Sequence, residues 1–252
     1  MEAYLDNSAT TRVDAQVQEL MKKLMDVDFG NPSSRHQKGV VAEGYIKEAR
    51  QKIAATLKVD PKELIITSGG TESNNMALIG TALAAKRKGN HIITTAVEHP
   101  SVKATASFLE EQGFRITFLS VDSRGQISLE DLKEALTPDT ILVSIMYVNN
   151  EIGTIQPVEE AAKLVHATVP GAVFHVDAIQ AYGKVMIRPK QQGIDLLSVS
   201  SHKFHGPKGA GFLYCSSKVN LHPIIFGGGQ QSGMRSGTEN VPGAAGMGMA
   251  EE

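Results

Sequence analysis

Short apolar runs that alternate with amphipathic segments constrain the fold of this chain more than any other feature. Seven runs stand at 64–67, 91–96, 116–121, 141–148, 173–177, 196–200 and 211–214. Most are separated by segments with apolar residues at helical spacing, at 72–88, 101–112, 128–136 and 158–168, and two more such segments precede them, at 14–28 and 39–57. Strands that alternate with helices form βαβ units. We therefore expect an α/β fold with a mostly parallel seven-stranded sheet flanked by helices on both faces.

Composition and charge narrow the class of function. The 252 residues carry a formal net charge of -2 with both signs mixed along the chain, so no basic stripe marks a nucleic-acid or membrane surface. The N-terminus lacks the features of a signal peptide, and no window approaches 18 apolar residues. We expect a cytoplasmic protein with a small-molecule substrate and no nucleic-acid or membrane partner. The single cysteine, Cys215, excludes a disulfide framework within the chain and a cysteine-based metal cluster, and we predict no metal site.

The first candidate site follows the run at 64–67. There the sequence Ser68-Gly69-Gly70-Thr71 leads into a helix, which places backbone amides and a hydroxyl at a helix N-terminus beside the end of a strand. Phosphate groups bind at such positions. The spacing matches neither the dinucleotide fingerprint nor the P-loop. The alternative interpretation is an ordinary helix cap.

The second and third candidates also stand at strand ends. Asp177 ends the run at 173–177, and Gln180 follows three residues later, so that both can reach one ligand. Lys203 follows the run at 196–200, and a lysine in a partly desolvated pocket has a lowered pKa and becomes a competent amine for a Schiff base. Taken singly, Asp177 is better explained as a turn cap and Lys203 as a lysine at a loop surface.

Together the three candidates match one cofactor. A phosphate, a pyridine nitrogen, a ring oxygen and an aldehyde each find a suitable group, and pyridoxal phosphate carries all four. With these motifs in place, the chain resembles the cysteine desulfurases of the NifS and IscS type, within the class-V, fold-type I pyridoxal-phosphate enzymes. The matching segments are 4–11, 30–34, 67–74, 148–153, 201–203 and 235–238.

The resemblance implies a role for each site residue. Lys203 forms the Schiff base and later shuttles a proton, and Asp177 keeps the ring nitrogen protonated. Gln180 bonds the ring oxygen, His99 stacks on the ring and assists proton transfer, and Asn150 contacts cofactor or substrate.

The resemblance also assigns the phosphate end of the cofactor. The residues that hold the phosphate within the subunit are Gly70, Thr71, Ser200 and His202. Thr238 reaches the phosphate of the neighbouring subunit in a homodimer, on a glycine-rich loop at 227–238 that could equally be a solvent-exposed loop.

The implied reaction converts L-cysteine to L-alanine. The sulfur passes to an enzyme cysteine persulfide and then to a sulfur-acceptor or Fe–S scaffold protein, for Fe–S cluster or thiocofactor synthesis. In the family a C-terminal small domain carries the nucleophilic cysteine. We expect residues 14–252 to form the large cofactor-binding domain, residues 1–13 to be a segment that associates with the small domain in the family, and the small domain to be absent here.

Cys215 stands in an apolar run, where we expect a small buried hydrophobe rather than a nucleophile. The chain alone is then expected to bind cofactor without transferring sulfur. The alternatives are another class-V enzyme, such as a selenocysteine lyase or an aminotransferase, and a non-catalytic scaffold that binds pyridoxal phosphate.

Overall fold

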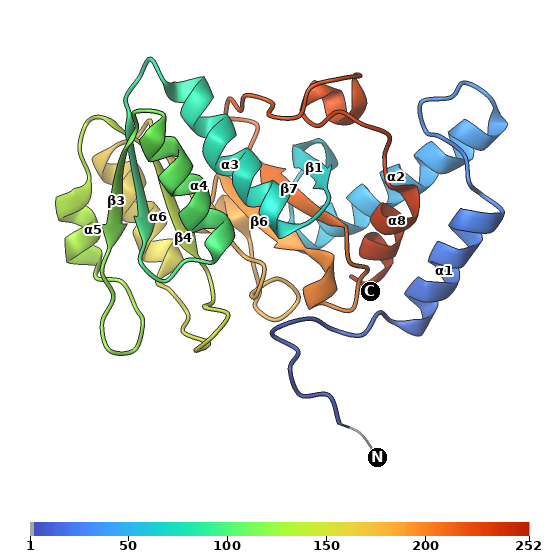
Figure 1. Ribbon diagram of the computed structural model, residues 1–252, viewed down its shortest axis with the longest axis horizontal. Helices are drawn as coiled ribbons and strands as arrows, with labels where there is room; N and C mark the ends of the chain where they lie inside the picture. The colour runs from blue at the N-terminus through green and yellow to red at the C-terminus, as the bar shows by residue number, and fades with distance from the viewer. Residues whose placement is uncertain (1–2, 252) are drawn as a thin grey trace.

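The seven predicted strands form one sheet in the computed structural model, which describes residues 3–251 (Figure 1). Residues 1 and 2 of the predicted segment 1–13, and residue 252 of the predicted segment 14–252, lie outside the described residues. The strands are β1 (Leu64–Thr67), β2 (His91–Thr95), β3 (Arg115–Leu119), β4 (Thr140–Met146), β5 (Val173–Asp177), β6 (Leu196–Ser200) and β7 (Gly211–Cys215). Their order is β1-β7-β6-β5-β4-β2-β3. β7 runs antiparallel to β1 and β6 and every other neighbouring pair is parallel, which confirms the predicted sheet.

The helices follow the predicted order. They are α1 (Ala15–Asp26), α2 (Gln37–Leu57), α3 (Gly70–Ala85), α4 (Pro100–Glu111), α5 (Leu129–Ala135), α6 (Val158–Thr168), α7 (Pro189–Gln192) and α8 (Val241–Met249), with 3₁₀ turns η1 (Pro61–Glu63), η2 (Ser201–Lys203) and η3 (Gln230–Gly233). The sequence patterns did not indicate α7, which is a single turn with Pro189 at its start and Gly193 in the left-handed conformation at its end. α3 begins two residues before its predicted start, because the chain turns sharply at Gly69, whose φ is 143°.

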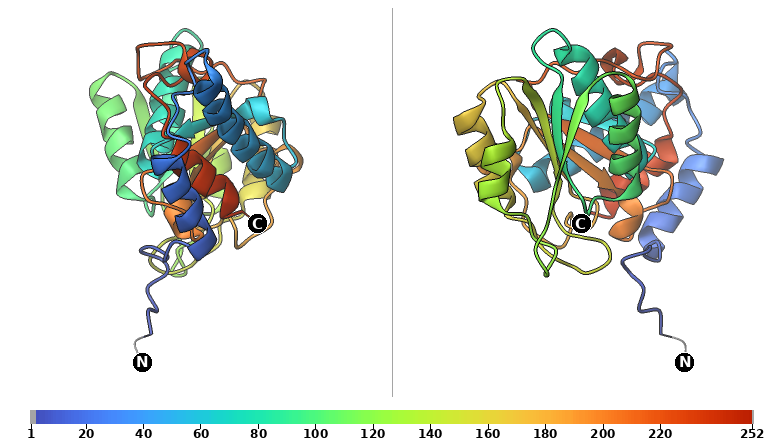
Figure 2. Two further views of the ribbon diagram at one scale, coloured as in Figure 1. Left: turned by 90° about the vertical axis from the view of Figure 1, so that its right-hand side faces the viewer. Right: turned by 60° about the vertical axis from the view of Figure 1, so that its left-hand side comes forward.

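Alternation along the strands sorts the core into two layers. Ile65, Leu142 and Leu196 pack in the cluster that includes apolar residues of α3 and α4. Their strand neighbours Val143 and Leu197 pack in the cluster that includes α2, α5, α6 and α8. Because successive side chains of a strand point to opposite faces, a buried strand contributes side chains to both clusters. The result is a three-layer α/β/α arrangement, which Figures 1 and 2 show from three sides.

Small residues let α8 lie close against its neighbours. A Cβ atom at Gly248 would stand 2.6 Å from the Cα of Ala49 on α2, and one at Gly246 would stand 3.1 Å from side-chain atoms of Val17 and Met21 on α1. Glycine is required here for the close approach of helix backbones. Within residues 3–251, no helix is both long enough and apolar enough to cross a bilayer.

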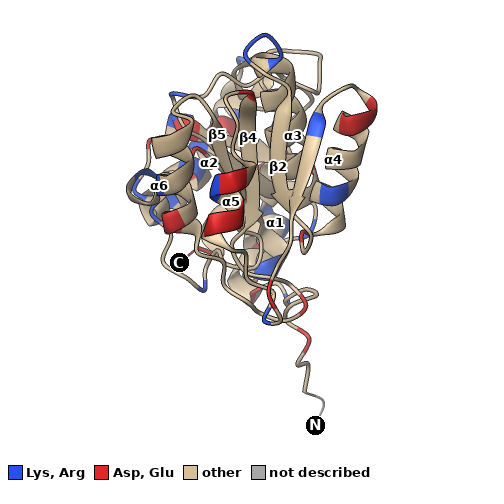
Figure 3. Ribbon diagram, turned by 90° about the vertical axis from the view of Figure 1, so that its left-hand side faces the viewer, with Lys and Arg blue, Asp and Glu red and all other residues tan. Residues whose placement is uncertain are grey.

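Charged side chains of both signs are intermixed over the outer helices and loops, while β2 and β4 carry none (Figure 3). The N-terminal segment leads away from the body of the molecule at its first described residues (Figure 2). Its later part crosses the chain that follows β6, where the amide of Thr11 donates to the carbonyl of His202 at 2.8 Å.

Candidate active site

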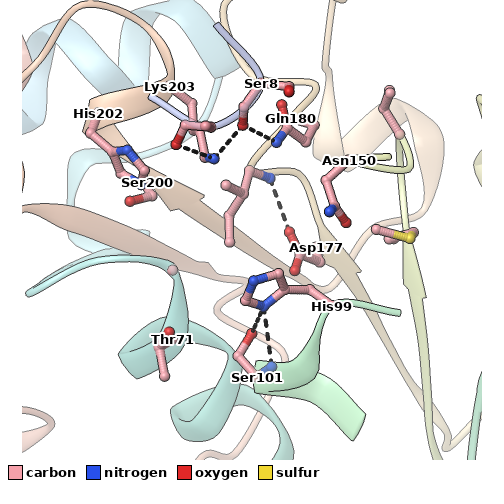
Figure 4. Close-up of a pocket in the computed structure, with 15 residues that line it drawn as sticks. Ser8, Thr71, His99, Ser101, Asn150, Asp177, Gln180, Ser200, His202 and Lys203 are labelled. Carbon is pink, nitrogen blue, oxygen red and sulfur yellow. Dashed lines mark hydrogen bonds between the residues drawn. The ribbon is translucent and has the colours of Figure 1, made fainter. Parts of the chain in front are cut away.

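A cavity of 440 Å³ lies at the carboxyl ends of β4, β5 and β6, beside the first residues of α3 and α4 (Figure 4). The carboxyl ends of parallel strands meet at one edge of a sheet, which is where such folds bind their ligands. Nine of the predicted site residues line this cavity: Gly70, Thr71, His99, Asn150, Asp177, Gln180, Ser200, His202 and Lys203. The tenth, Thr238, lies exposed on the loop before α8 and does not line it.

Lys203 presents its amine to the cavity from η2, directly after β6. Its Nζ donates to the backbone carbonyls of Ser8 and Ala9, the latter at 2.9 Å. Burial, together with the charge of Lys184, lowers the pKa of Lys203 below its ordinary value. The amine is therefore easier to deprotonate than a solvent-exposed lysine, as an amine nucleophile requires.

Asp177 ends β5 and is 4% exposed. Its Oδ1 accepts from the amide of Ile179 at 3.0 Å, and its Oδ2 accepts from the side-chain amide of Asn74 at 2.8 Å. Burial raises the pKa of Asp177 above its ordinary value. A cationic partner in the cavity would offset the cost of ionising this carboxyl group.

His99 is held in one orientation at the start of α4. Its Nδ1 accepts from the amide of Ser101 at 3.1 Å and lies 2.8 Å from the Ser101 hydroxyl oxygen. Because Nδ1 is an acceptor, the proton of the neutral imidazole resides on Nε2. Figure 4 shows the His99 ring beside the Asp177 carboxyl group.

Polar groups of the type that bind phosphate gather at the start of α3. Gly70 and Thr71 open this 16-residue helix, whose first backbone amides have no intrahelical acceptor. Ser200 and His202 reach the same cavity from the end of β6. A Cβ atom at Gly70 would lie 2.1 Å from Cδ1 of Ile179, so a larger residue there would displace the Ile179 side chain, which also lines the cavity.

The sequence patterns did not single out four residues that shape the cavity. Ser8 accepts from both Lys203 and Gln180, the latter at 2.8 Å, through its backbone carbonyl, a group that every residue has (Figure 4). Asn74, which bonds Asp177, and Ser101, which lines the cavity, are both buried. Met146 also lines the cavity, from the end of β4. No spacing pattern distinguishes these residues, because their roles depend on contacts that form only in the folded chain.

An ion pair joins the loop that carries Thr238 to the start of α3. Nε of Arg235 lies 2.8 Å from Oε1 of Glu72, on the first turn of α3. Burial opposes a charge on Glu72, but hydrogen bonds from Arg235 and Ser68 outweigh it and hold the pKa of Glu72 below its ordinary value.

Comparison with known proteins agrees with this geometry. Residues 3–252 match the family described as aminotransferase class-V. The chain belongs to the class-V aminotransferase family. It is 50% identical to the cysteine desulfurase IscS of Dictyoglomus turgidum over 100% of its own length and 49% identical to that of Methanosarcina thermophila over 99%. It spans 63% and 61% of the length of these two relatives.

Solved structures with the same fold are also similar in sequence. A NifS-like protein superposes with a TM-score of 0.97 at 44% identity, over 100% of this chain and 69% of that one. DndA from Streptomyces lividans superposes with a TM-score of 0.86 at 45% identity, over 99% of this chain and 71% of that one. The class-V, NifS-like resemblance inferred from the motifs is thereby confirmed, as is the fold-type I architecture.

Proposed function

We propose that this chain is the cofactor-binding part of a pyridoxal-phosphate-dependent cysteine desulfurase. The observation that carries the proposal is the convergence in one cavity of a lysine amine, a buried carboxyl group and a helix N-terminus suited to phosphate. The relatives named as cysteine desulfurases support the choice of L-cysteine as substrate.

The donor set of the cavity fits this cofactor. Asp177 offers a buried carboxyl group to a protonated ring nitrogen, and Lys203 offers an amine to the aldehyde. Gly70 begins α3, whose first backbone amides have no intrahelical acceptor and could donate to a phosphate. His99 would cover one face of the ring, and Gln180 and Asn150, which also line the cavity, would bind the ring oxygen.

When bound, pyridoxal phosphate supplies an electron sink for negative charge that develops at the substrate α carbon. Lys203 would take the proton from that carbon and return it, and its lowered pKa suits both directions of transfer. Asp177 holds the proton on the ring nitrogen. The carbonyl of Ser8 keeps Lys203 and Gln180 in position.

Sulfur transfer also needs a thiolate that attacks the sulfur of the substrate. The one thiol of this sequence, Cys215, stands at the end of β7, and this antiparallel strand carries it to the opposite end of the sheet from the cavity. Burial, with the nearby carboxylates of Glu63 and Asp195, raises the pKa of Cys215 to about 12. We therefore propose that the persulfide forms on a thiol from outside this sequence, which then supplies a sulfur acceptor or Fe–S scaffold protein.

We propose further that two copies of the chain form a homodimer, in which Thr238 contacts the phosphate bound to the partner. The exposure of Thr238 and the Arg235–Glu72 ion pair that holds its loop support this arrangement. Sedimentation should give the mass of a dimer, and Thr238→Val should weaken cofactor binding without changing that mass.

The test of the proposed function is an absorbance spectrum with added pyridoxal phosphate, before and after borohydride. The wild-type protein should show a visible band that reduction removes, and Lys203→Ala should lack it. Lys133→Ala is the matched control, because this exposed lysine of α5 neither lines the cavity nor acts on the pKa of Lys203. A band retained in Lys203→Ala, or none in the wild type, would refute the proposal and favour a non-catalytic scaffold.

Product analysis separates the enzyme classes. With L-cysteine and an added thiol, the expected products are alanine and sulfide. A keto acid would instead indicate an aminotransferase, and activity confined to selenocysteine would indicate a selenocysteine lyase.

A further inference from the structure

Two carboxyl groups are buried close together behind the cavity. Glu98 is 2% exposed and Asp177 is 4% exposed. Met146 connects them: its amide donates to Oε1 of Glu98 at 2.8 Å, and it stands opposite Asp177 in the ladder between β4 and β5. Only Asp177 lines the cavity.

The surroundings of the two groups differ in a way that decides which one bears the charge. Each oxygen of Asp177 accepts a hydrogen bond from an N–H group, and positive charge on His99 or Lys203 favours its ionised form. Oε1 of Glu98 accepts from Met146 and from the hydroxyl of Thr95 at 2.8 Å, but its Oε2 is buried without a hydrogen-bond partner among the described residues.

The charged groups that act on Glu98 do not favour its ionisation either. They are Asp177, which repels a second negative charge, and Lys103, an exposed residue of α4 whose attraction is the smaller effect. A buried carboxylate with one oxygen unpaired and a like charge beside it is among the costliest groups that a protein can hold.

We propose that Glu98 carries a proton, so that Asp177 alone bears the buried negative charge of the site, and that Glu98 is thereby a positioning residue for the partner of the ring nitrogen. The inference deepens the proposed function and rests on it for the identity of the ring. In agreement, burial and the neighbouring Asp177 raise the pKa of Glu98 to about 8.

The arrangement separates two roles of Glu98. Oε1 ties the end of β2 to the end of β4 in either protonation state, which fixes the chain directly before His99. The proton on the carboxyl group sets the charge. Above pH 8 Glu98 ionises, and the second negative charge then disfavours the ionised form of Asp177.

The experiment is a pH titration of the full chain without cofactor, with ¹³C-labelled glutamate carboxyl groups observed by NMR. The Glu98 signal is assigned by its loss in Glu98→Gln, or in Glu98→Asp if the first variant does not fold. At pH 7 it should have the chemical shift of a protonated acid, with a midpoint near pH 8. Glu63 is the internal control, because this buried glutamate pairs with Lys190 at 2.8 Å and should be ionised at pH 7.

The coupling to Asp177 is tested in the Asp177→Asn variant, where removal of the neighbouring charge should lower the Glu98 midpoint by at least half a pH unit. A carboxylate signal for Glu98 at pH 7, or a midpoint unmoved by Asp177→Asn, would overturn the proposal. Both readouts are independent of cofactor binding. A chain that binds no pyridoxal phosphate would refute the proposed function and leave the titration of Glu98 to be judged separately.

With pyridoxal phosphate bound, the absorbance of the wild-type protein should change between pH 7 and 9 at the Glu98 midpoint, and this step should be missing in Glu98→Gln. A purely structural role would give both proteins the same pH dependence of absorbance, and that result would also overturn the proposal.

Discussion

Replacing Glu98 by Gln should change the pH dependence of stability by an amount that follows from its burial. The pKa of Glu98 is about 8 in the folded protein, against 4.5 ordinarily. For a group with a raised pKa, the stability that it contributes is complete below the ordinary value and is lost as the pH rises through the folded value. At 1.36 kcal/mol per pKa unit, the difference between the folded and the ordinary pKa corresponds to about 5 kcal/mol of stability. About 2 kcal/mol of this stability is lost between pH 6 and 8.

Glutamine keeps the shape of the side chain and an oxygen for Met146 and Thr95, but it does not titrate. The free energy of unfolding of Glu98→Gln should therefore gain about 2 kcal/mol relative to wild type between pH 6 and 8. In a chain of this size that is a relative rise of about 4–8 °C in melting temperature. Urea unfolding of both proteins without cofactor at pH 6, 7 and 8 measures the difference.

Glu63→Gln is the matched control. Burial opposes the charge on Glu63, but hydrogen bonds from Lys190 and from the amides of Asp60 and Ser217 outweigh it, and the pKa lies below its ordinary value. A carboxyl group with a lowered pKa stabilises the fold fully above pH 4.5 and less as the pH falls below it. The change in the free energy of unfolding caused by Glu63→Gln should therefore stay constant between pH 6 and 8. A difference between Glu98→Gln and wild type that is equally flat would refute the protonated state of Glu98.

Three further substitutions test other parts of the structure. Arg235→Met leaves Glu72 without its ion-pair partner and should lower the free energy of unfolding, measured in urea, by about 2 kcal/mol at pH 7. This loss should shrink below pH 4 as Glu72 is protonated, and a loss unchanged in acid would contradict the ion pair. Gly211→Ala places a Cβ atom 2.5 and 2.6 Å from backbone atoms and should lower stability by about 3 kcal/mol, whereas a neutral result would show that the strands can separate there. Burial lowers the pKa of His175 to about 3, so the neutral imidazole stabilises the fold fully above pH 6.5 and progressively less as the pH falls. His175→Leu leaves two serine hydroxyls unpaired and should cost about 2 kcal/mol at pH 8 and less at pH 5, as measured by thermal unfolding.

The strands and most of the cavity were predictable from sequence for one physical reason. Residues that follow parallel strands meet at one edge of the sheet, so Asp177, Lys203 and the turn at Gly70 could be expected at the same edge once the strands were recognised. The exact end of β4 was not predictable. Val148 is apolar like the strand before it, but it pairs with Ile155 across a turn and not with β5.

The residues behind the cavity could not be predicted, because their roles depend on contacts between distant segments. Asn74 and Asp177 are 103 positions apart and meet only through the packing of α3 on the sheet. Glu98 looks in sequence like a polar residue at the end of a strand, but in the fold it is buried and accepts from the amide of Met146, which is 48 positions away. The place of β7 between β1 and β6 is likewise a property of the whole sheet.

The N-terminal segment illustrates how backbone groups complete a site that side-chain patterns only outline. Its association with a small domain stays a prediction, while its carbonyls at Ser8 and Ala9 both accept hydrogen bonds from Lys203. A neutral amine has two hydrogens and one lone pair. If both hydrogens are donated to these two carbonyls, the lone pair is directed away from both of them and is free to react. Burial and the charge of Lys184 favour this neutral form, so the backbone of residues 8 and 9 orients the same amine that its surroundings help to deprotonate.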